Sequence, residues 1–198
     1  MERPDICRDL IHFIRAYGLN DAYQILLEII RTRKIIGSNK CIRGGYNCIC
    51  FSEAPLHFFK MHFQELTCSQ NHFQPFGIKI SKRWLFELGG RPVIYEPEED
   101  FDKLHESHKW RHVRFEPTSN PPIDFTWERE WRIKTDELRI TELTAKIIMP
   151  TVEYARDLFR WYDTDQDLMV QMYTMIMDEM SALQYRKDFE WQIEIVNF

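Results

Sequence analysis

The chain has 198 residues, enough for one domain with a hydrophobic core. Hydrophobic residues make up 44% and aromatic residues 14%, which excludes a disordered chain, and the formal net charge of −5 gives no general attraction to nucleic acid. No apolar run approaches the roughly 20 residues that span a bilayer, and the charged residues 1–5 do not begin a signal peptide. We therefore expect one cytoplasmic domain over residues 1–198 and no membrane partner.

The cysteine content supports the same compartment. The chain has five cysteines and no export signal, which favours reduced thiols. Cys41, Cys48 and Cys50 are close in sequence, but strand alternation would point Cys48 and Cys50 to one face with a buried residue between them. That spacing does not fit a zinc knuckle, so we expect small buried thiols and no metal.

The first half of the chain predicts alternating strands and helices. Residues 9–15 form a short strand that contains His12, and apolar residues at helical spacing predict a helix over residues 22–36. The nearly continuous apolar run at residues 48–52 is typical of a buried strand. The further elements predicted here are a helix at 56–66, a strand at 76–80, a helix at 82–88 and a strand at 91–95.

The second half predicts three more strands and two helices. Residues 125–133 alternate apolar and charged side chains, as a half-buried strand does, which would place Glu128 and Glu130 on one face. The later elements are a strand at 144–149, a helix at 152–162, a methionine-rich helix at 165–183 and a strand at 189–196. Residues 150–198 would be a helical extension that returns to a final strand, and its methionines would serve core packing or a partner surface.

Three separated segments carry side chains suited to chemistry. His12 lies in the first strand, Ser52 ends the buried strand, and Glu128 and Glu130 come much later. Each signal alone is typical of ordinary structure; the two glutamates, for example, would be satisfied by pairing with Arg114 or Arg132. The order of the segments along the chain is more informative than any one of them.

In that order the segments resemble the ADP-ribosyltransferase superfamily. The shared features are a strand with His or Arg, a helix that ends near a Gly, a strand with an aromatic-Phe-Ser pattern and a late strand with a Glu. The resemblance covers about the first sixty residues and the strand with Glu128 and Glu130. It implies an α+β fold with a split, mixed but mainly antiparallel β-sheet, flanking helices, a C-terminal helical segment and NAD as substrate.

A second resemblance covers most of residues 10–135. The segments that carry it are ICFSEAPL (49–56), FGIKISKRW (76–84), GGRPVIY (89–95) and EREWR (128–132). They are similar to segments of the bacterial abortive-infection proteins of the AbiGi type. This resemblance implies a role in phage defence through arrest of, or damage to, the host cell.

The resemblance to ADP-ribosyltransferases implies roles for the side chains that match its pattern. Nicotinamide would leave the ribose through an oxocarbenium-like transition state, and Glu130, or Glu128 in its place, would bind a ribose hydroxyl and stabilise the positive charge. His12 would donate to the adenosine ribose, and Ser52 would support the nicotinamide side. Glu130, His12 and Ser52 are therefore the expected catalytic residues.

The same resemblance suggests groups that bind the dinucleotide. An arginine is suited to the pyrophosphate because its planar cation bonds two oxygens at once, and Arg43, Arg83 and Arg91 are the candidates. Tyr46 or Phe51 would stack on nicotinamide. No metal is expected in this chemistry.

Three classes of function follow. The first is an enzyme that transfers ADP-ribose to a nucleic acid or a protein, or hydrolyses NAD. The second is a non-catalytic antitoxin or regulator that binds a cognate toxin or another partner of a defence system. The third is a nuclease, for which His57, His62, His72 and Glu65 are the candidate residues, although they form no metal motif.

Overall fold

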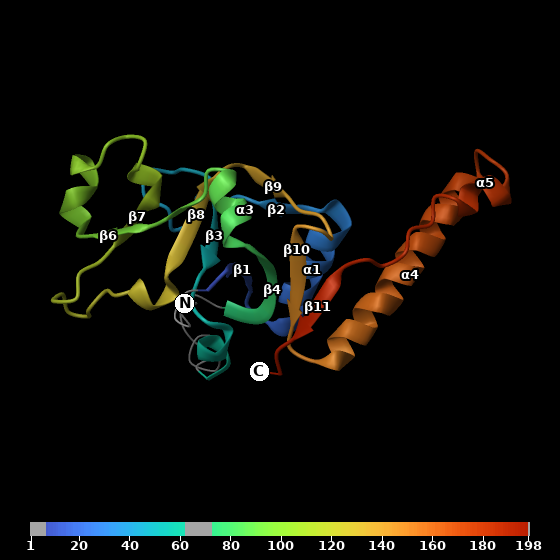
Figure 1. Cartoon of the computed structure of the whole chain (residues 1–198), viewed down its shortest axis with the longest axis horizontal. Helices are drawn as coiled ribbons and strands as arrows, with labels where there is room; N and C mark the ends of the chain where they lie inside the picture. Colours follow the sequence, from blue (N-terminus) through green and yellow to red (C-terminus); the bar gives the residue numbers. More distant parts are fainter. Residues whose placement is uncertain (1–6, 62–72, 198) are drawn as a thin grey trace.

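The structure is a computed structural model that describes residues 7–61 and 73–197. It is an α+β protein with a seven-stranded, mixed and mostly antiparallel sheet, two small sheets and a long C-terminal helix. In Figure 1 the large sheet occupies the middle of the molecule, with β6 and β7 at one end and α4 and α5 at the other.

The seven-stranded sheet joins segments from the whole length of the chain. In spatial order its strands are β11 (Gln192–Ile195), β10 (Ala145–Met149), β4 (Phe73–Ser81), β1 (Asp9–Arg15), β3 (Cys48–Ser52), β8 (Glu130–Lys134) and β5 (Arg91–Pro92). The pair β10–β11 is parallel, and the other neighbours are antiparallel. The order places β1, β3 and β8 side by side, so the three segments with candidate site residues meet in one sheet.

Two small sheets and several helices complete the described part of the chain. The antiparallel sheet pairs β2 (Lys34–Ile36) with β9 (Glu137–Arg139), and the parallel one pairs β6 (Ile94–Glu96) with β7 (His112–Arg114). The helices are α1 (Leu19–Thr32), α3 (Lys82–Glu87), α4 (Val152–Thr174) and α5 (Glu179–Leu183). Short 3-10 helices lie at Glu98–Lys103, Lys109–Arg111 and Thr126–Glu128, and residues 56–61 are helical.

The hydrophobic core lies on both faces of the large sheet. On one face, α1 buries Leu26 and Ile30 in a cluster with Leu10 of β1 and Ile78 of β4. On the other face, a separate cluster forms around Phe13, Phe59 and Phe73. Full burial of such a side chain contributes about 1.5–3 kcal/mol, so these clusters fix the positions of the central strands.

Gly77 allows β4 to approach β1 closely. A Cβ built at Gly77 would lie 2.9 Å from the carbonyl oxygen of His12 and 3.1 Å from Cγ2 of Ile11. Gly77 is opposite Phe13 in the antiparallel register. The absence of a side chain at this position therefore sets the spacing of the two central strands.

Several predicted elements are confirmed. The strands at 9–15 and 48–52 have the predicted bounds, and those at 76–80 and 144–149 correspond to β4 and β10. The helix at 82–88 is α3, and the final strand is β11, shorter than predicted. The α+β class is also confirmed.

The helix predicted over residues 22–36 is wrong at both ends. α1 begins at Leu19 and ends at Thr32, because Arg33 adopts the left-handed conformation with φ 55°. Ile35 then pairs with Leu138 as part of β2. Ile35 is β-branched and finds a partner strand that lies about a hundred positions away in sequence, so a tertiary contact decides its conformation.

The strand predicted over residues 125–133 is also wrong in its first half. Thr126–Glu128 is a 3-10 helix, and Arg129 has φ 45°, a left-handed conformation that is uncommon outside glycine. The strand begins only at Glu130. Alternation along a strand therefore does not relate Glu128 to Glu130.

Three further predictions need correction. Residues 91–95 belong to two strands in different sheets, β5 and β6. Residues 152–162 and the start of 165–183 form one helix of 23 residues, α4, and the end of the second segment forms α5. The predicted helix at 56–66 is helical over residues 56–61, and the remainder lies outside the described residues.

Candidate functional site

A cleft of about 370 Å³ opens between β1 and β3. The register of these strands has one Cα pair, Ile11 opposite Ser52. The lining residues that carry functional groups are His12, Arg15, Tyr17, Ser38, Lys40, Cys41, Cys48, Cys50, Ser52, Glu128 and Glu130. The volume falls within the roughly 300–1,000 Å³ of small-molecule sites. His12, Ser52, Glu128 and Glu130 thus come together from three segments, the first and last of which are more than a hundred positions apart.

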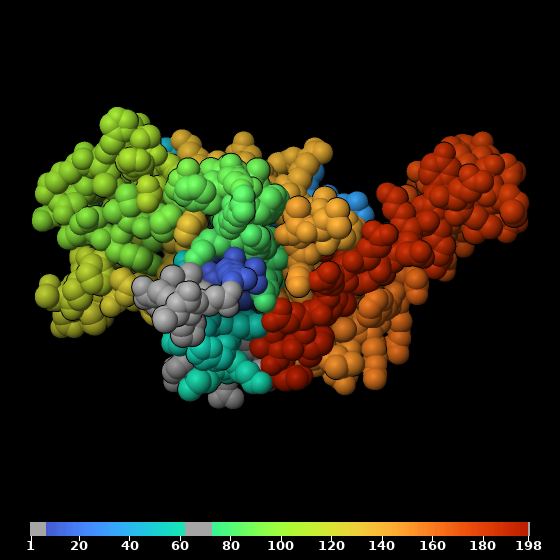
Figure 2. All heavy atoms as spheres, viewed as in Figure 1, coloured from blue at the N-terminus to red at the C-terminus, as the bar shows by residue number. Residues whose placement is uncertain are grey.

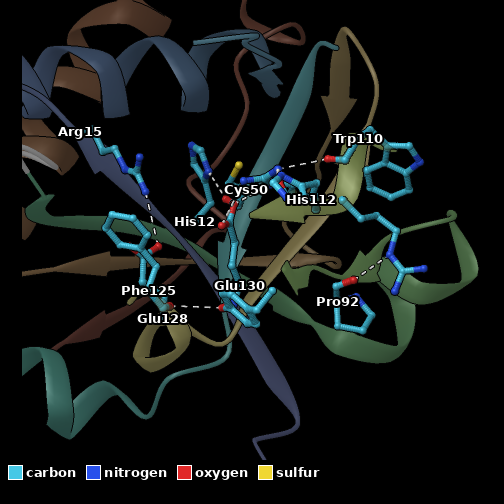
Figure 3. Close-up of polar contacts among 12 residues, drawn as sticks. His12, Arg15, Cys50, Pro92, Trp110, His112, Phe125, Glu128 and Glu130 are labelled. Carbon is cyan, nitrogen blue, oxygen red and sulfur yellow. Dashed lines mark hydrogen bonds and ion pairs between the residues drawn. The ribbon is translucent and has the colours of Figure 1, made fainter. Parts of the chain in front are cut away.

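His12 lies on β1, beside the position where this strand pairs with β3. In Figure 3 its ring lies between Arg15 and Cys50, and its Nδ1 is 2.8 Å from the carbonyl oxygen of Cys50. Burial is the main cause that lowers the pKa of His12, so the imidazole is neutral at pH 7. A carbonyl oxygen only accepts, so Nδ1 carries the proton and Nε2 is left as an acceptor. With Nδ1 bonded to this carbonyl, Nε2 is the ring nitrogen left to bind another group, and in the neutral ring it can only accept.

Glu130 is held at the cleft wall by Arg132. The Nε and Nη2 atoms of Arg132 donate to the two carboxylate oxygens of Glu130 at 2.8 and 3.3 Å, and Nη1 donates to the carbonyls of Trp110 and His112. Both side chains are buried. The pairing with Arg132 that was considered from the sequence exists, and it fixes the carboxylate in one orientation at the cleft.

Glu128 is the second buried carboxyl at the cleft. It is 5% exposed, and burial is the first cause that raises its pKa from 4.5 to about 7. The guanidinium of Arg15 lies 3.6 Å from Oε2 and opposes this effect. Glu128 therefore exchanges a proton near neutral pH, as a general acid or base requires.

Ser52 joins the end of β3 to the turn that carries Glu128. Its hydroxyl donates to the carbonyl oxygen of Glu128 at 2.5 Å and accepts from the amide of Ala54 at 3.1 Å. The side chain is buried, and its one proton is used in this bond. Ser52 is thus built as a positioning residue for Glu128.

Tyr95 positions the other side of the same turn. Its hydroxyl accepts from the amide of Glu130 at 3.1 Å and donates to the carbonyl oxygen of Phe125 at 3.2 Å. Burial raises the pKa of Tyr95 to about 12, so it stays protonated. Ser52 and Tyr95 together fix the two glutamates on either side of Arg129, whose left-handed backbone turns both toward the cleft.

One aromatic side chain and two thiols at the cleft are largely shielded from solvent by burial. Phe51 lines the cleft and lies 5.7 Å from His12 between ring centroids, but it is almost fully buried and packs in the core. Burial raises the pKa of the Cys48 thiol, and that of Cys50 well above its ordinary value. Both thiols are protonated at neutral pH and are poor nucleophiles.

Arg43 and Tyr46 lie elsewhere. Arg43 donates to the Glu98 carbonyl at 2.6 Å and stacks over Phe101 at 4.1 Å. Tyr46 donates to the carboxylate of Glu106. Neither residue is among those of the described chain that line the cleft. The two residues instead link the Gly44-Gly45 loop to the segment between β6 and β7.

The other candidate arginines are also engaged elsewhere. Arg83 pairs with Glu87 along α3, and Arg91 donates to the carbonyls of Phe86 and Gly90 while it stacks over the Phe86 ring. Of the residues considered for a nuclease, His62, Glu65 and His72 lie outside the described residues.

Arg15 is a cation at the cleft that was not expected from the sequence. Strand alternation would place it on the face opposite His12. The cleft, however, is lined by residues of both faces of β1, Ile11 and Phe13 as well as His12. Arg15 lies over the ring of Phe73, 4.5 Å from its centroid, and Phe73 packs with Phe13. Its side chain is 42% exposed, so it remains accessible to a ligand. No local pattern in the sequence shows that both faces of this strand line one cleft.

Comparison of the chain with protein-family models, with curated proteins and with solved structures finds no match. Across residues 7–61 and 73–197, no three His, Cys, Asp or Glu side chains are grouped so that they could hold a metal ion. None of the helices in these ranges is both long and apolar enough to cross a membrane.

Proposed function

We propose that this cleft binds NAD and cleaves its bond to nicotinamide, so that ADP-ribose passes to a macromolecule or to water. In this proposal the large sheet is a split sheet of the ADP-ribosyltransferase type, and the chain acts in abortive infection. The observation that carries the proposal is the meeting of His12, Glu128 and Glu130 at one cleft.

The chemistry needs a fixed negative group beside the ribose. When the bond between C1′ and the nicotinamide nitrogen breaks, its electron pair leaves with nicotinamide and positive charge develops on the sugar. The Glu130 carboxylate, oriented by Arg132, would accept from a ribose hydroxyl and stabilise that charge. A preorganised carboxylate does this without reorganisation at the moment of reaction.

The acceptor must lose a proton as its oxygen or nitrogen bonds to C1′. Glu128 suits this step, because a carboxyl with a pKa of about 7 is half ionised at neutral pH and takes up a proton readily. Glu128 is thus assigned here to the acceptor, and Glu130 to the ribose. Ser52 acts indirectly, through its bond to the Glu128 carbonyl.

Two further groups would bind the dinucleotide. Nε2 of His12 would accept from an adenosine ribose hydroxyl, and Arg15 would bond the pyrophosphate from the cleft edge. Arg15 takes the place that Arg43 was expected to fill, since Arg43 is held by Glu98 and Phe101.

The test is expression in bacteria, with mass spectrometry of NAD and its products in the cells. Wild-type protein should deplete NAD, release nicotinamide and arrest growth, while Glu130→Gln should do none of these. Glu87→Gln, which changes an exposed glutamate on α3, is the matched control and should behave as wild type.

A second candidate is a non-catalytic interaction protein, an antitoxin or regulator on the same fold. The observation that favours it is the two-point bond between Glu130 and Arg132, which already occupies the carboxylate. Harmless expression with unchanged NAD, together with suppression of a toxin encoded beside it, would support this candidate and remove the enzymatic one.

A further inference from the structure

The C-terminal helices form an arm that projects away from the sheet. Figure 1 shows α4 and α5 extending from the body, and Figure 2 shows this arm standing clear of the remaining atoms. The segment after α5 runs back along α4: Tyr185 stacks on Tyr173 with ring centroids 4.4 Å apart, and the amide of Lys187 donates to Gln166 at 3.0 Å. Arg186 also pairs with Asp163 at 3.2 Å. The arm is therefore a hairpin held by its own contacts.

The outer half of the arm exposes a set of apolar side chains. The set comprises Leu168, Met172, Met175, Ile176, Met180 and Leu183. Their exposed fractions run from 46% for Leu183 to 83% for Met175. The first four are spaced as positions i, i+4, i+7 and i+8, which brings them to one side of the helix and the turn that follows it. Patches of this kind mark sites of interaction.

The same half of the arm is acidic. Residues 163–188 contain six Asp or Glu and two Lys or Arg, a net charge of −4, whereas the whole chain has −5. The remainder of the chain is thus nearly neutral, at −1. Negative charge around an apolar surface attracts a basic partner and repels an anionic lipid surface or a second acidic arm.

We propose that this apolar, acidic face binds an amphipathic helix of another protein, one with apolar residues on one side and Lys or Arg beside them. Methionine suits such a surface because its unbranched, polarisable side chain adapts to differently shaped partners. An amphipathic helix would place apolar side chains three and four positions apart against the exposed set. This inference concerns the arm and is independent of the chemistry in the cleft.

The test uses the full chain and a fluorescent, short helical peptide of leucine and lysine with one apolar side. Its matched counter-probe has glutamate in place of lysine. The lysine peptide should bind, and raised salt should weaken binding. The double variant Met175→Ser, Ile176→Ser should bind at least tenfold more weakly, and the control Leu143→Ser, an exposed apolar residue of the body, should bind as wild type.

The proposal would be overturned if the lysine peptide bound equally well to wild type and to the double variant. It would also be overturned if the glutamate peptide bound to wild type as tightly as the lysine peptide does. Sedimentation that shows a dimer abolished by the double variant would assign the face to a second copy instead. Binding to phosphatidylserine vesicles that the double variant abolishes would assign it to a lipid surface. Either of these results would also overturn the proposal.

Discussion

Arg132 bonds both carboxylate oxygens of Glu130 at the wall of the cleft, at 2.8 and 3.3 Å. The pair is almost fully shielded from water, and two backbone carbonyls accept from the third guanidinium nitrogen. The guanidinium that orients Glu130 is therefore itself held in place by the backbone. Such support is what a site needs if one carboxylate is to meet a developing charge.

Glu130→Ala should lower the free energy of unfolding by about 3–5 kcal/mol, because the buried guanidinium of Arg132 loses its partner. The matched change, Glu87→Ala, breaks an exposed pair with Arg83 and should cost only about 0.3–0.5 kcal/mol. Urea denaturation of both variants checks this. Similar losses for the two would mean that the Glu130–Arg132 pair does not form as described.

The stability of the protein should depend on the ionisation of Glu128. The folded-state pKa, about 7, is above the ordinary 4.5, so the folded state binds the proton more tightly. Its contribution to stability is fully present below pH 4.5 and is lost as pH rises through 7, by about 3 kcal/mol in all.

Glu128→Gln should remove this dependence, since glutamine mimics the protonated acid. Denaturation curves between pH 4 and pH 8 should show the variant gaining stability relative to wild type as pH rises. Glu153→Gln, on the surface of α4, provides the control. If wild type and Glu128→Gln keep a constant difference across this range, the carboxyl does not titrate near 7.

Arg15→Ala tests both assigned roles of the guanidinium. Its positive charge lowers the pKa of Glu128, so its loss should raise that pKa above 7 and shift the rising limb of the pH–activity profile upward. Loss of one charge-assisted bond to the pyrophosphate should raise the KM for NAD by about tenfold or more. Steady-state kinetics measured as a function of pH give both the pH–activity profile and the KM for NAD, and Arg83→Ala is the control. An unchanged KM for NAD in Arg15→Ala would show that Arg15 does not bind the dinucleotide.

Gly77→Ala tests the spacing of β1 and β4. The added methyl group would meet the His12 carbonyl at 2.9 Å, so the strands must move apart, at a cost of about 1–3 kcal/mol. Gly18→Ala is a fair comparison, because nothing lies within 4 Å of the Cβ position at Gly18. This change should lower the free energy of unfolding by only about a few tenths of a kcal/mol. A melting temperature that Gly77→Ala leaves unchanged would argue against this strand pairing.

The sequence predicts elements whose own residues decide their conformation. The apolar run at 48–52 and the alternation at 9–15 are strands with the predicted bounds. Residues whose conformation depends on distant partners were predicted wrongly: Ile35 pairs with Leu138, a contact that no local pattern reveals. The sequence predicted two helices in place of α4, because the aspartates near the middle of α4 resemble the polar residues that separate two helices.

The same distinction applies to the site. His12, Ser52, Glu128 and Glu130 were identified through resemblance, and the sheet order brings them to one cleft. Arg15 was missed because strand alternation places it on the face opposite His12, whereas residues of both faces of β1 line the cleft. Arg43 was expected at a phosphate, but its partners Glu98 and Phe101 come from a segment that the sequence could not place in space.

The most direct test of the proposed reaction is the release of nicotinamide from NAD by the purified protein, measured by chromatography. The wild type and Glu87→Gln should release nicotinamide at the same rate, and Glu130→Gln should reduce the rate by at least a hundredfold while it still binds NAD. Release at the wild-type rate from Glu130→Gln, or no release and no saturable NAD binding by the wild type, would contradict the proposal.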